Sequence, residues 1–280
     1  MSTVGADLWR PLSGCGEGCL PAAGQVPAVP AARQVARLLA VLGMLLAGAV
    51  LAAAYPLLPP DARRAGGRAW ARGTTRACGA RLVVRGRPPR GPALLVANHV
   101  SWLDVVALLA LGPARMVAKR EVRGWPLVGP IARAAGTVFV DRSRPRELPA
   151  TVRRVADLLR AGRTVAVYPE GTTWCGSADP AHVPPRRGFR AAMFQAAVDA
   201  GAAVVPVRIS YRCAGTGTPT TAPAFVGEAN LWRSVRRVLA ARDLVVQVAV
   251  GAALHPTPEA DRRRLARTAE SALRLTPLRR

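Results

Sequence analysis

The chain has 280 residues, half of them apolar, which is enough for one substantial hydrophobic core with a small appendage. Its formal net charge is +24, but no RNP-type, zinc-finger or basic-zipper pattern accompanies the arginines, so the charge alone does not indicate nucleic-acid binding. An anionic membrane surface or a phosphorylated substrate explains this charge at least as well.

The cysteines are odd in number and irregularly spaced. Cys15 and Cys19 bracket Gly-Glu-Gly with no histidine or second cysteine pair nearby, so we expect no metal site. Nothing indicates a disulfide framework, which fits a reducing compartment.

The N-terminal part divides into a tail and an apolar run. Residues 1–37 are rich in Gly, Ala and Pro and are expected to form a flexible tail. Leu38–Leu58 carries no charge over 21 residues, the length of a helix that spans a bilayer or lies in one leaflet. Two alternatives are a signal peptide cleaved near Ala52-Ala53-Ala54 and a buried soluble helix, which the lack of a polar face disfavours.

A basic segment, Asp61–Arg90, follows with nine arginines and one acid. A helix would stack four of them, spaced four residues apart, in one stripe: Arg64, Arg68, Arg72 and Arg76. Such a stripe is either a solvated face or a contact with anionic head groups, at about 1 kcal/mol per basic residue. We therefore expect residues 38–78 to anchor the chain to the cell membrane, with the domain at 79–280 on the cytoplasmic side.

Strand-like and helix-like segments alternate through residues 79–280. The expected strands are Arg81–Arg85, Ala93–Ala97, Arg115–Ala118, Thr137–Val140, Thr164–Tyr168, Ala203–Ile209, Ala224–Val226 and Val245–Val250. The expected helices are Trp102–Leu111, Pro126–Ala134, Leu148–Ala161, Gly188–Ala200, Leu231–Ala241 and Pro258–Leu275. Several strands are apolar throughout, as in a sheet buried on both faces. The pattern predicts an α/β fold with a mostly parallel or mixed central sheet flanked by helices.

The strand Ala93–Ala97 leads directly into Asn98, His99 and, five residues later, Asp104. Open α/β sheets bind ligands at the carboxyl ends of their strands, and neutral histidine accepts a proton near pH 7. Positions five apart on a helix diverge by about 140°, so Asp104 reaches His99 only if the chain turns between them. Ser101 and Asp104 also match a capping box, and His99 can be a core histidine; one carboxylate has oxygens for both roles.

Three further strand ends carry unusual residues: Gly136–Arg142, Tyr168–Thr173 and Val204–Val207. Taken singly each is weak, because Arg142 alone suits a surface ion and Pro-Glu-Gly-Thr suits an ordinary turn. Pro206 alone suggests an edge strand or a bulge.

Taken together and in this order, the four segments resemble the glycerolipid acyltransferase family, the lysophosphatidic acid acyltransferases. That family is marked by Asn-His-x4-Asp, Gly-x-x-Phe-x-x-Arg, Phe-Pro-Glu-Gly-Thr-Arg and Val-x-Pro-Val blocks. The resemblance covers about residues 80 to 210, and it is specific because four spaced blocks agree.

The resemblance implies a direct acyl transfer without a cofactor or metal, in which acyl-CoA or acyl carrier protein is the co-substrate. It gives His99 the role of general base on a lysolipid hydroxyl and Asp104 the role of orienting the imidazole. The substrate-binding residues that it implies are Lys119, Arg142, Glu170, Gly171 and Thr172. Consistently, there is no Gly-x-Ser-x-Gly elbow, and Ser101 is better placed as a cap than as a nucleophile.

One departure concerns the acceptor: Thr173 stands where phosphatidate-forming members have an arginine that clamps phosphate. Lys119, Arg142, Arg187 or Arg190 would have to compensate, or the acceptor has another head group, as in relatives that acylate lyso-ornithine lipids. We expect acylation of 1-acylglycerol-3-phosphate to phosphatidate first and of another lysolipid second. A remote alternative is a non-catalytic basic protein that binds membranes or nucleic acid; membrane lipids and no nucleic acid are the expected partners.

Overall fold

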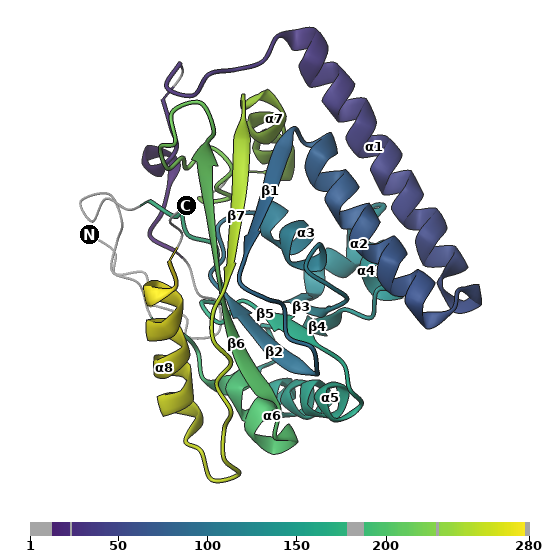
Figure 1. Cartoon of the computed structure of the whole chain (residues 1–280), viewed down its shortest axis with the longest axis vertical. Helices are drawn as coiled ribbons and strands as arrows, with labels where there is room; N and C mark the ends of the chain where they lie inside the picture. Colours follow the sequence, from purple (N-terminus) through teal and green to yellow (C-terminus); the bar gives the residue numbers. More distant parts are fainter. Residues whose placement is uncertain (1–12, 23, 178–187, 228–229, 278–280) are drawn as a thin grey trace.

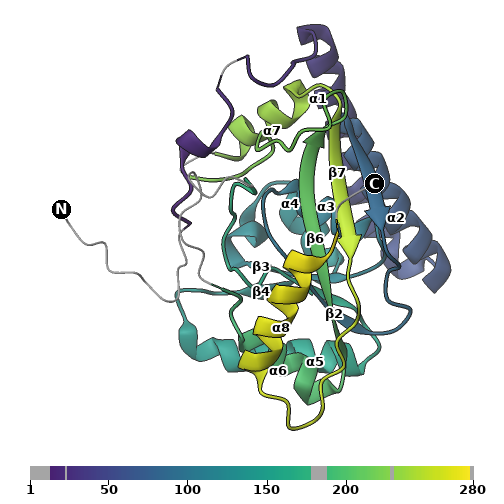
Figure 2. The same cartoon turned by 60° about the vertical axis from the view of Figure 1, so that its left-hand side comes forward.

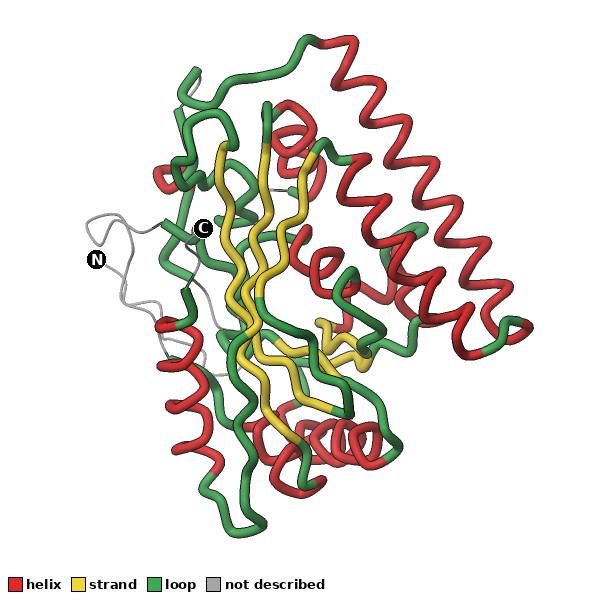
Figure 3. Tube along the Cα trace, in the orientation of Figure 1, coloured by secondary structure: helices red, strands yellow, loops and turns green. Residues whose placement is uncertain are grey.

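The computed structural model of the chain describes residues 13–22, 24–177, 188–227 and 230–277. Its centre is a twisted sheet, drawn in yellow in Figure 3. The sheet has seven strands in the order β1-β7-β6-β2-β5-β3-β4. Neighbouring strands are parallel except β6 and β7, so the expected mixed sheet is confirmed. The strands are β1 Ala80–Arg85, β2 Ala93–Ala97, β3 Arg115–Lys119, β4 Val138–Val140, β5 Val165–Val167, β6 Ala203–Cys213 and β7 Leu244–Val250.

The central strands are buried on both faces because helices cover both sides of the sheet (Figures 1 and 2). The helices are α1 Ala31–Ala54, α2 Pro60–Ala77, α3 Leu103–Leu109, α4 Val128–Ala134, α5 Leu148–Arg160, α6 Ala192–Ala200, α7 Leu231–Ala240 and α8 Arg262–Leu275. Alternate residues of β2 face opposite sides. Leu94 and Val96 join a core with α5, α6 and α8, whereas Leu95 and Ala97 join one with α2, α3 and α7.

Helices α1 and α2 form a hairpin along one side of the molecule (Figure 1). The indole nitrogen of Trp70 donates to the Met44 carbonyl at 2.7 Å, and a Cβ on Gly48 would lie 2.6 Å from that nitrogen. Glycine at position 48 thus permits the close approach of the two helices.

The outer face of α1 is apolar and exposed. Its exposed large residues recur at helical spacing: Val35, Leu39, Leu42, Leu46 and Val50. Residues Ala31–Leu57 qualify by length and composition as a candidate membrane span, and only 6% of the most apolar window is buried. The buried soluble helix considered above is therefore wrong. On α2, all four arginines of the predicted stripe are exposed, as expected of a basic face.

The expectation of a flexible tail over residues 1–37 is wrong for the described part. Helix α1 begins at Ala31, and Cys15 and Val29 are buried. The Val29 amide donates to the Ala240 carbonyl at 2.9 Å, and the Arg37 guanidinium donates to the Leu239 and Ala241 carbonyls. Composition missed this segment because it is held by scattered apolar residues and by backbone bonds.

Two further expectations differ from the fold. Residues 224–226 form a buried loop instead of a strand, and its backbone bonds to other loops. Pro206 lies inside the sheet, between β2 and the chain that leaves β7. Both backbone groups of Val204 bond to Leu254, so the Pro206 nitrogen, two residues on, faces the irregular chain between Gly251 and Leu254 that follows β7. A proline is tolerated there because no ladder donor is lost.

Candidate active site

Four parallel strands bring three of the four sequence blocks, together with Lys119, to one edge of the sheet; the fourth block, Val204–Val207, lies within β6. Strands β2, β5, β3 and β4 are neighbours in this order and point the same way, so their carboxyl ends share that edge. His99, Glu170, Lys119 and Arg142 lie at or just after these ends. With about 4.8 Å between strands, the ends of β2 and β3 are about 10 Å apart.

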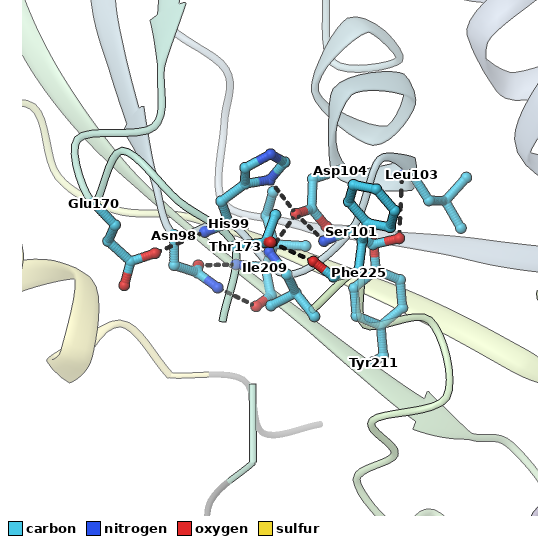
Figure 4. A network of polar contacts seen from close by, with 11 residues as sticks. Asn98, His99, Ser101, Leu103, Asp104, Glu170, Thr173, Ile209, Tyr211 and Phe225 are labelled. Atoms are coloured by element: carbon cyan, nitrogen blue, oxygen red, sulfur yellow. Dashed lines mark hydrogen bonds and ion pairs between the residues drawn. The ribbon is translucent and has the colours of Figure 1, made fainter. Parts of the chain in front are cut away.

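His99 and Asp104 form a hydrogen-bonded pair at this edge (Figure 4). The imidazole Nδ1 lies 2.8 Å from Asp104 Oδ2, and the histidine side chain is 20% exposed whereas the aspartate is fully buried. The predicted turn between them exists, because α3 starts only at Leu103. His99 is therefore not an isolated core histidine.

The hydrogen bonds to Asp104 identify the tautomer of the neutral His99 ring. Asp104 Oδ2 also accepts the backbone N–H groups of Val100 at 2.6 Å and Ser101 at 2.8 Å, and Oδ1 accepts the Tyr211 hydroxyl. Because Oδ2 accepts these bonds, the neutral tautomer that fits has its proton on His99 Nδ1 and its lone pair on Nε2. Asp104 thus both holds His99 and satisfies amides before α3, so both interpretations of this residue apply.

Asn98 explains how the chain turns so sharply after β2. Its side-chain nitrogen donates to the Ile209 carbonyl at 2.9 Å, and its side-chain oxygen accepts the Ile209 amide at 2.8 Å. The side-chain amide thereby continues the β2–β6 ladder in place of backbone. The backbone can then leave the sheet at His99 without losing a pair of bonds to β6.

The turn after β5 fixes the backbone of His99 from the other side. The His99 amide donates to Glu170 Oε2 at 2.9 Å, and the His99 carbonyl accepts the Trp174 amide at 2.8 Å. Gly171 has φ +73°, a conformation that glycine adopts without strain, and its amide donates to the Tyr168 carbonyl. Glu170 is buried and supports the histidine, whereas Thr172 is partly exposed beside it.

Two tyrosines complete the surroundings of the pair, and sequence reasoning assigned a role to neither. The Tyr168 ring stacks on the His99 ring, with centroids 3.9 Å apart and an interplanar angle of 10°. Burial, reinforced by the charge of Asp104, raises the pKa of Tyr168 and of Tyr211 well above the usual value. Tyr211 is therefore a neutral phenol that donates to Asp104; its only sequence signal is the alternation of buried residues along β6.

Cations lie farther along the same edge. The Lys119 ammonium sits 5.5 Å from the centre of the Trp125 ring. Burial lowers the pKa of Arg142 below its usual value. The negative charge of Glu121 opposes this lowering, and the positive charge of Arg190 adds to it. No ion pair within the described part of the chain involves Lys119 or Arg142. The carboxylate of Glu121 is close enough to act on Arg142 electrostatically, but the two do not form an ion pair.

Two predicted contributors to anion binding differ from the others. Arg187 lies outside the described residues. The Thr173 hydroxyl donates to the Phe225 carbonyl, so this hydrogen is not offered to an anion (Figure 4). Among the described residues, the side chains grouped closely enough to hold a metal are Cys15, Cys19 and Cys175, and none of them belongs to the His99–Asp104 pair.

Comparison with known proteins agrees with this architecture. Residues 81–210 match the model of the family described as Acyltransferase. The chain is 39% identical over 194 residues to a lyso-ornithine lipid O-acyltransferase of Pseudomonas aeruginosa, covering 69% of this chain and 70% of that protein. It is 36% identical over 166 residues to a 1-acyl-sn-glycerol-3-phosphate acyltransferase of Neisseria gonorrhoeae, covering 58% and 62% of the two chains.

A solved structure has the same fold at low sequence identity. The crystal structure of the 1-acyl-sn-glycerophosphate acyltransferase of Thermotoga maritima aligns over 85% of this chain and 95% of its own, with a TM-score of 0.53 and 21% identity. The resemblance first seen in four short blocks thus extends to the sequence of whole domains and to the fold. The chain belongs to the acyltransferase family that contains these enzymes.

Proposed function

We propose that His99 and Asp104 catalyse direct transfer of a fatty acyl group from a thioester to a lysophospholipid hydroxyl. His99 Nε2 takes the hydroxyl proton as the alcohol oxygen attacks the thioester carbonyl. Asp104 stabilises the imidazolium that forms, and the carbon–sulfur bond breaks as the proton passes to the leaving thiolate. The observation that carries the proposal is the hydrogen bond between His99 Nδ1 and the buried Asp104 carboxylate, which also accepts two backbone N–H groups. This bond leaves Nε2 as the base.

We infer that the acceptor is 1-acylglycerol-3-phosphate, which becomes phosphatidate. Support comes from Lys119 and Arg142, cations on the edge that carries His99. A phosphate held there would leave the glycerol hydroxyl near the imidazole, because long basic side chains reach across neighbouring strands. The Glu170-Gly171-Thr172 turn would form the wall between the base and the cations.

A second candidate acceptor is a lyso-ornithine lipid, favoured by Thr173. Position 173 has a threonine and therefore no guanidinium to clamp a phosphate. The threonine hydroxyl donates to the Phe225 carbonyl instead. The relative from Pseudomonas aeruginosa acts, by its name, on such a lipid. The chemistry at His99 is the same for both acceptors.

We also propose that α1 and α2 hold the enzyme at the cytoplasmic face of the cell membrane, where thioester donors are made available. The exposed apolar residues of α1 and the exposed arginines of α2 support this placement. Protease should therefore degrade the domain in inside-out vesicles and spare it in right-side-out ones. The reverse pattern would refute the cytoplasmic placement.

Replacing His99 by Ala should lower kcat by about 10²–10⁴, because the general base is lost. Asp104→Asn should also be strongly impaired, since a neutral amide cannot stabilise the imidazolium in the same way. The assay supplies acyl-CoA and acyl carrier protein thioesters in parallel, which identifies the donor. Thermal unfolding serves as the folding control, and a folded His99→Ala enzyme with full activity would contradict the mechanism.

Replacing Tyr211 by Phe should lower kcat about 3- to 30-fold with little change in KM, because it removes a hydrogen bond to the charged Asp104. Tyr168→Phe is the matched comparison, since it keeps the ring stacked on His99 and removes a hydroxyl that has no hydrogen-bond partner in the described structure. Steady-state kinetics of both variants provide the measurement. Equal effects of the two substitutions would show that the Tyr211 hydroxyl does not act through Asp104.

Replacing Thr173 by Arg should raise phosphatidate formation relative to acylation of lyso-ornithine lipid, if position 173 selects the acceptor. Thr173→Gln is the control, because it adds length without charge and loses the same bond to Phe225. The measurement is the ratio of kcat/KM for the two acceptors. An unchanged ratio in Thr173→Arg would remove this residue from the explanation of acceptor choice.

A further inference from the structure

We propose that Cys15, Cys19 and Cys175 form a zinc-binding site that fastens the N-terminal segment to the loop behind His99. The three Sγ atoms all lie within 4.8 Å of one another. In tetrahedral zinc thiolate sites the Zn–S distance is about 2.3 Å, which puts neighbouring sulfurs about 3.8 Å apart. Small side-chain rotations would therefore bring the observed cluster to zinc geometry.

The cluster joins two segments that are distant in sequence. A short 3-10 helix, η1 (Glu17–Cys19), bends the chain so that the Cys19 amide donates to the Gly16 carbonyl at 3.0 Å, which returns Cys19 toward Cys15. Cys175 comes from the loop that follows β5. The earlier expectation of no metal site rested on Cys15 and Cys19 having no further ligand nearby, and the fold supplies that ligand.

The surroundings provide both protection and an entrance. Cys15 and Cys175 are 3% and 0% exposed, whereas Cys19 is half-buried. Cys19 lines a cavity of about 300 Å³ together with Ser177 and Cys213. The fourth ligand of a zinc ion held by the three thiolates would be water, which could enter through this cavity beside Cys19.

Zinc suits these donors better than the alternatives. Thiolates are soft ligands that select zinc over the hard cations magnesium and calcium. A disulfide would join two sulfurs and leave the third without a role, whereas a metal engages all three.

The position of the cluster gives the metal a structural consequence. Cys175 follows Trp174, whose amide donates to the His99 carbonyl at 2.8 Å. The next residue, Gly176, packs so closely on Val100 that a Cβ there would lie 3.0 Å from its Cγ2. A metal on Cys175 would thus anchor the backbone that supports His99.

The first test is the metal content of the full-length protein, purified in detergent without a histidine tag. Mass spectrometry of the elements should find about one zinc per chain. Cys19→Ala and Cys175→Ala should lose at least nine-tenths of it, and Cys78→Ala, which removes a buried cysteine outside the cluster, should keep it. Should Cys175→Ala fail to fold, the half-buried Cys19 position still provides the test.

The second test uses cobalt and heat. Co²⁺ added to the chelator-treated protein should give the intense visible absorption of tetrahedral thiolate sites, and chelation should lower the midpoint of thermal unfolding in wild type but not in Cys19→Ala. Three outcomes would overturn the proposal. These are wild-type protein that neither contains zinc nor gives the cobalt spectrum, Cys19→Ala protein that retains zinc, and a disulfide between Cys175 and either partner in freshly purified protein.

Discussion

The buried carboxylate of Asp104 is the constraint on which the rest of the active edge depends. A charge removed from water is costly unless hydrogen bonds replace its hydration, and Asp104 is fully buried. Its donors come from the end of β2, from the chain before α3 and, through Tyr211, from β6. These elements must therefore keep their relative positions for the carboxylate to remain satisfied, and the imidazole inherits that rigidity.

The same logic explains why this site needs residues that do no chemistry. The Asn98 side chain takes over the ladder to β6, which lets the backbone turn at His99. Glu170 and Trp174 then bind the His99 amide and carbonyl. An imidazole held by Asp104 alone could still pivot about its backbone, so positioning of the base requires both sets of contacts.

Most of the parallel sheet and the His99–Asp104 pair could be predicted, because both depend on patterns that are local in sequence. Apolar runs of five or so residues marked β2 and β5, and the strand-end rule put His99 at the active edge. Tyr211 and Cys175 could not be predicted, since their roles exist only through partners about a hundred residues or more away. The docked N-terminal segment was missed for the same reason: its composition resembles a linker, and the bonds that hold it come from α7 and its C-terminal end.

The loop at residues 221–227 shows how far the site extends beyond the four blocks. The Phe225 amide donates to the Val100 carbonyl at 2.9 Å, and its carbonyl accepts the Thr173 hydroxyl. One residue outside the family match thus ties the first block to the third. An arginine at position 173 would carry a positive charge, whereas this threonine is neutral and bonds to the Phe225 carbonyl. Residue 173 thus belongs to the block that carries Glu170 and also bonds to the loop at residues 221–227. Under the proposed function, a substitution there would act on the acceptor site and on the support of the catalytic base together.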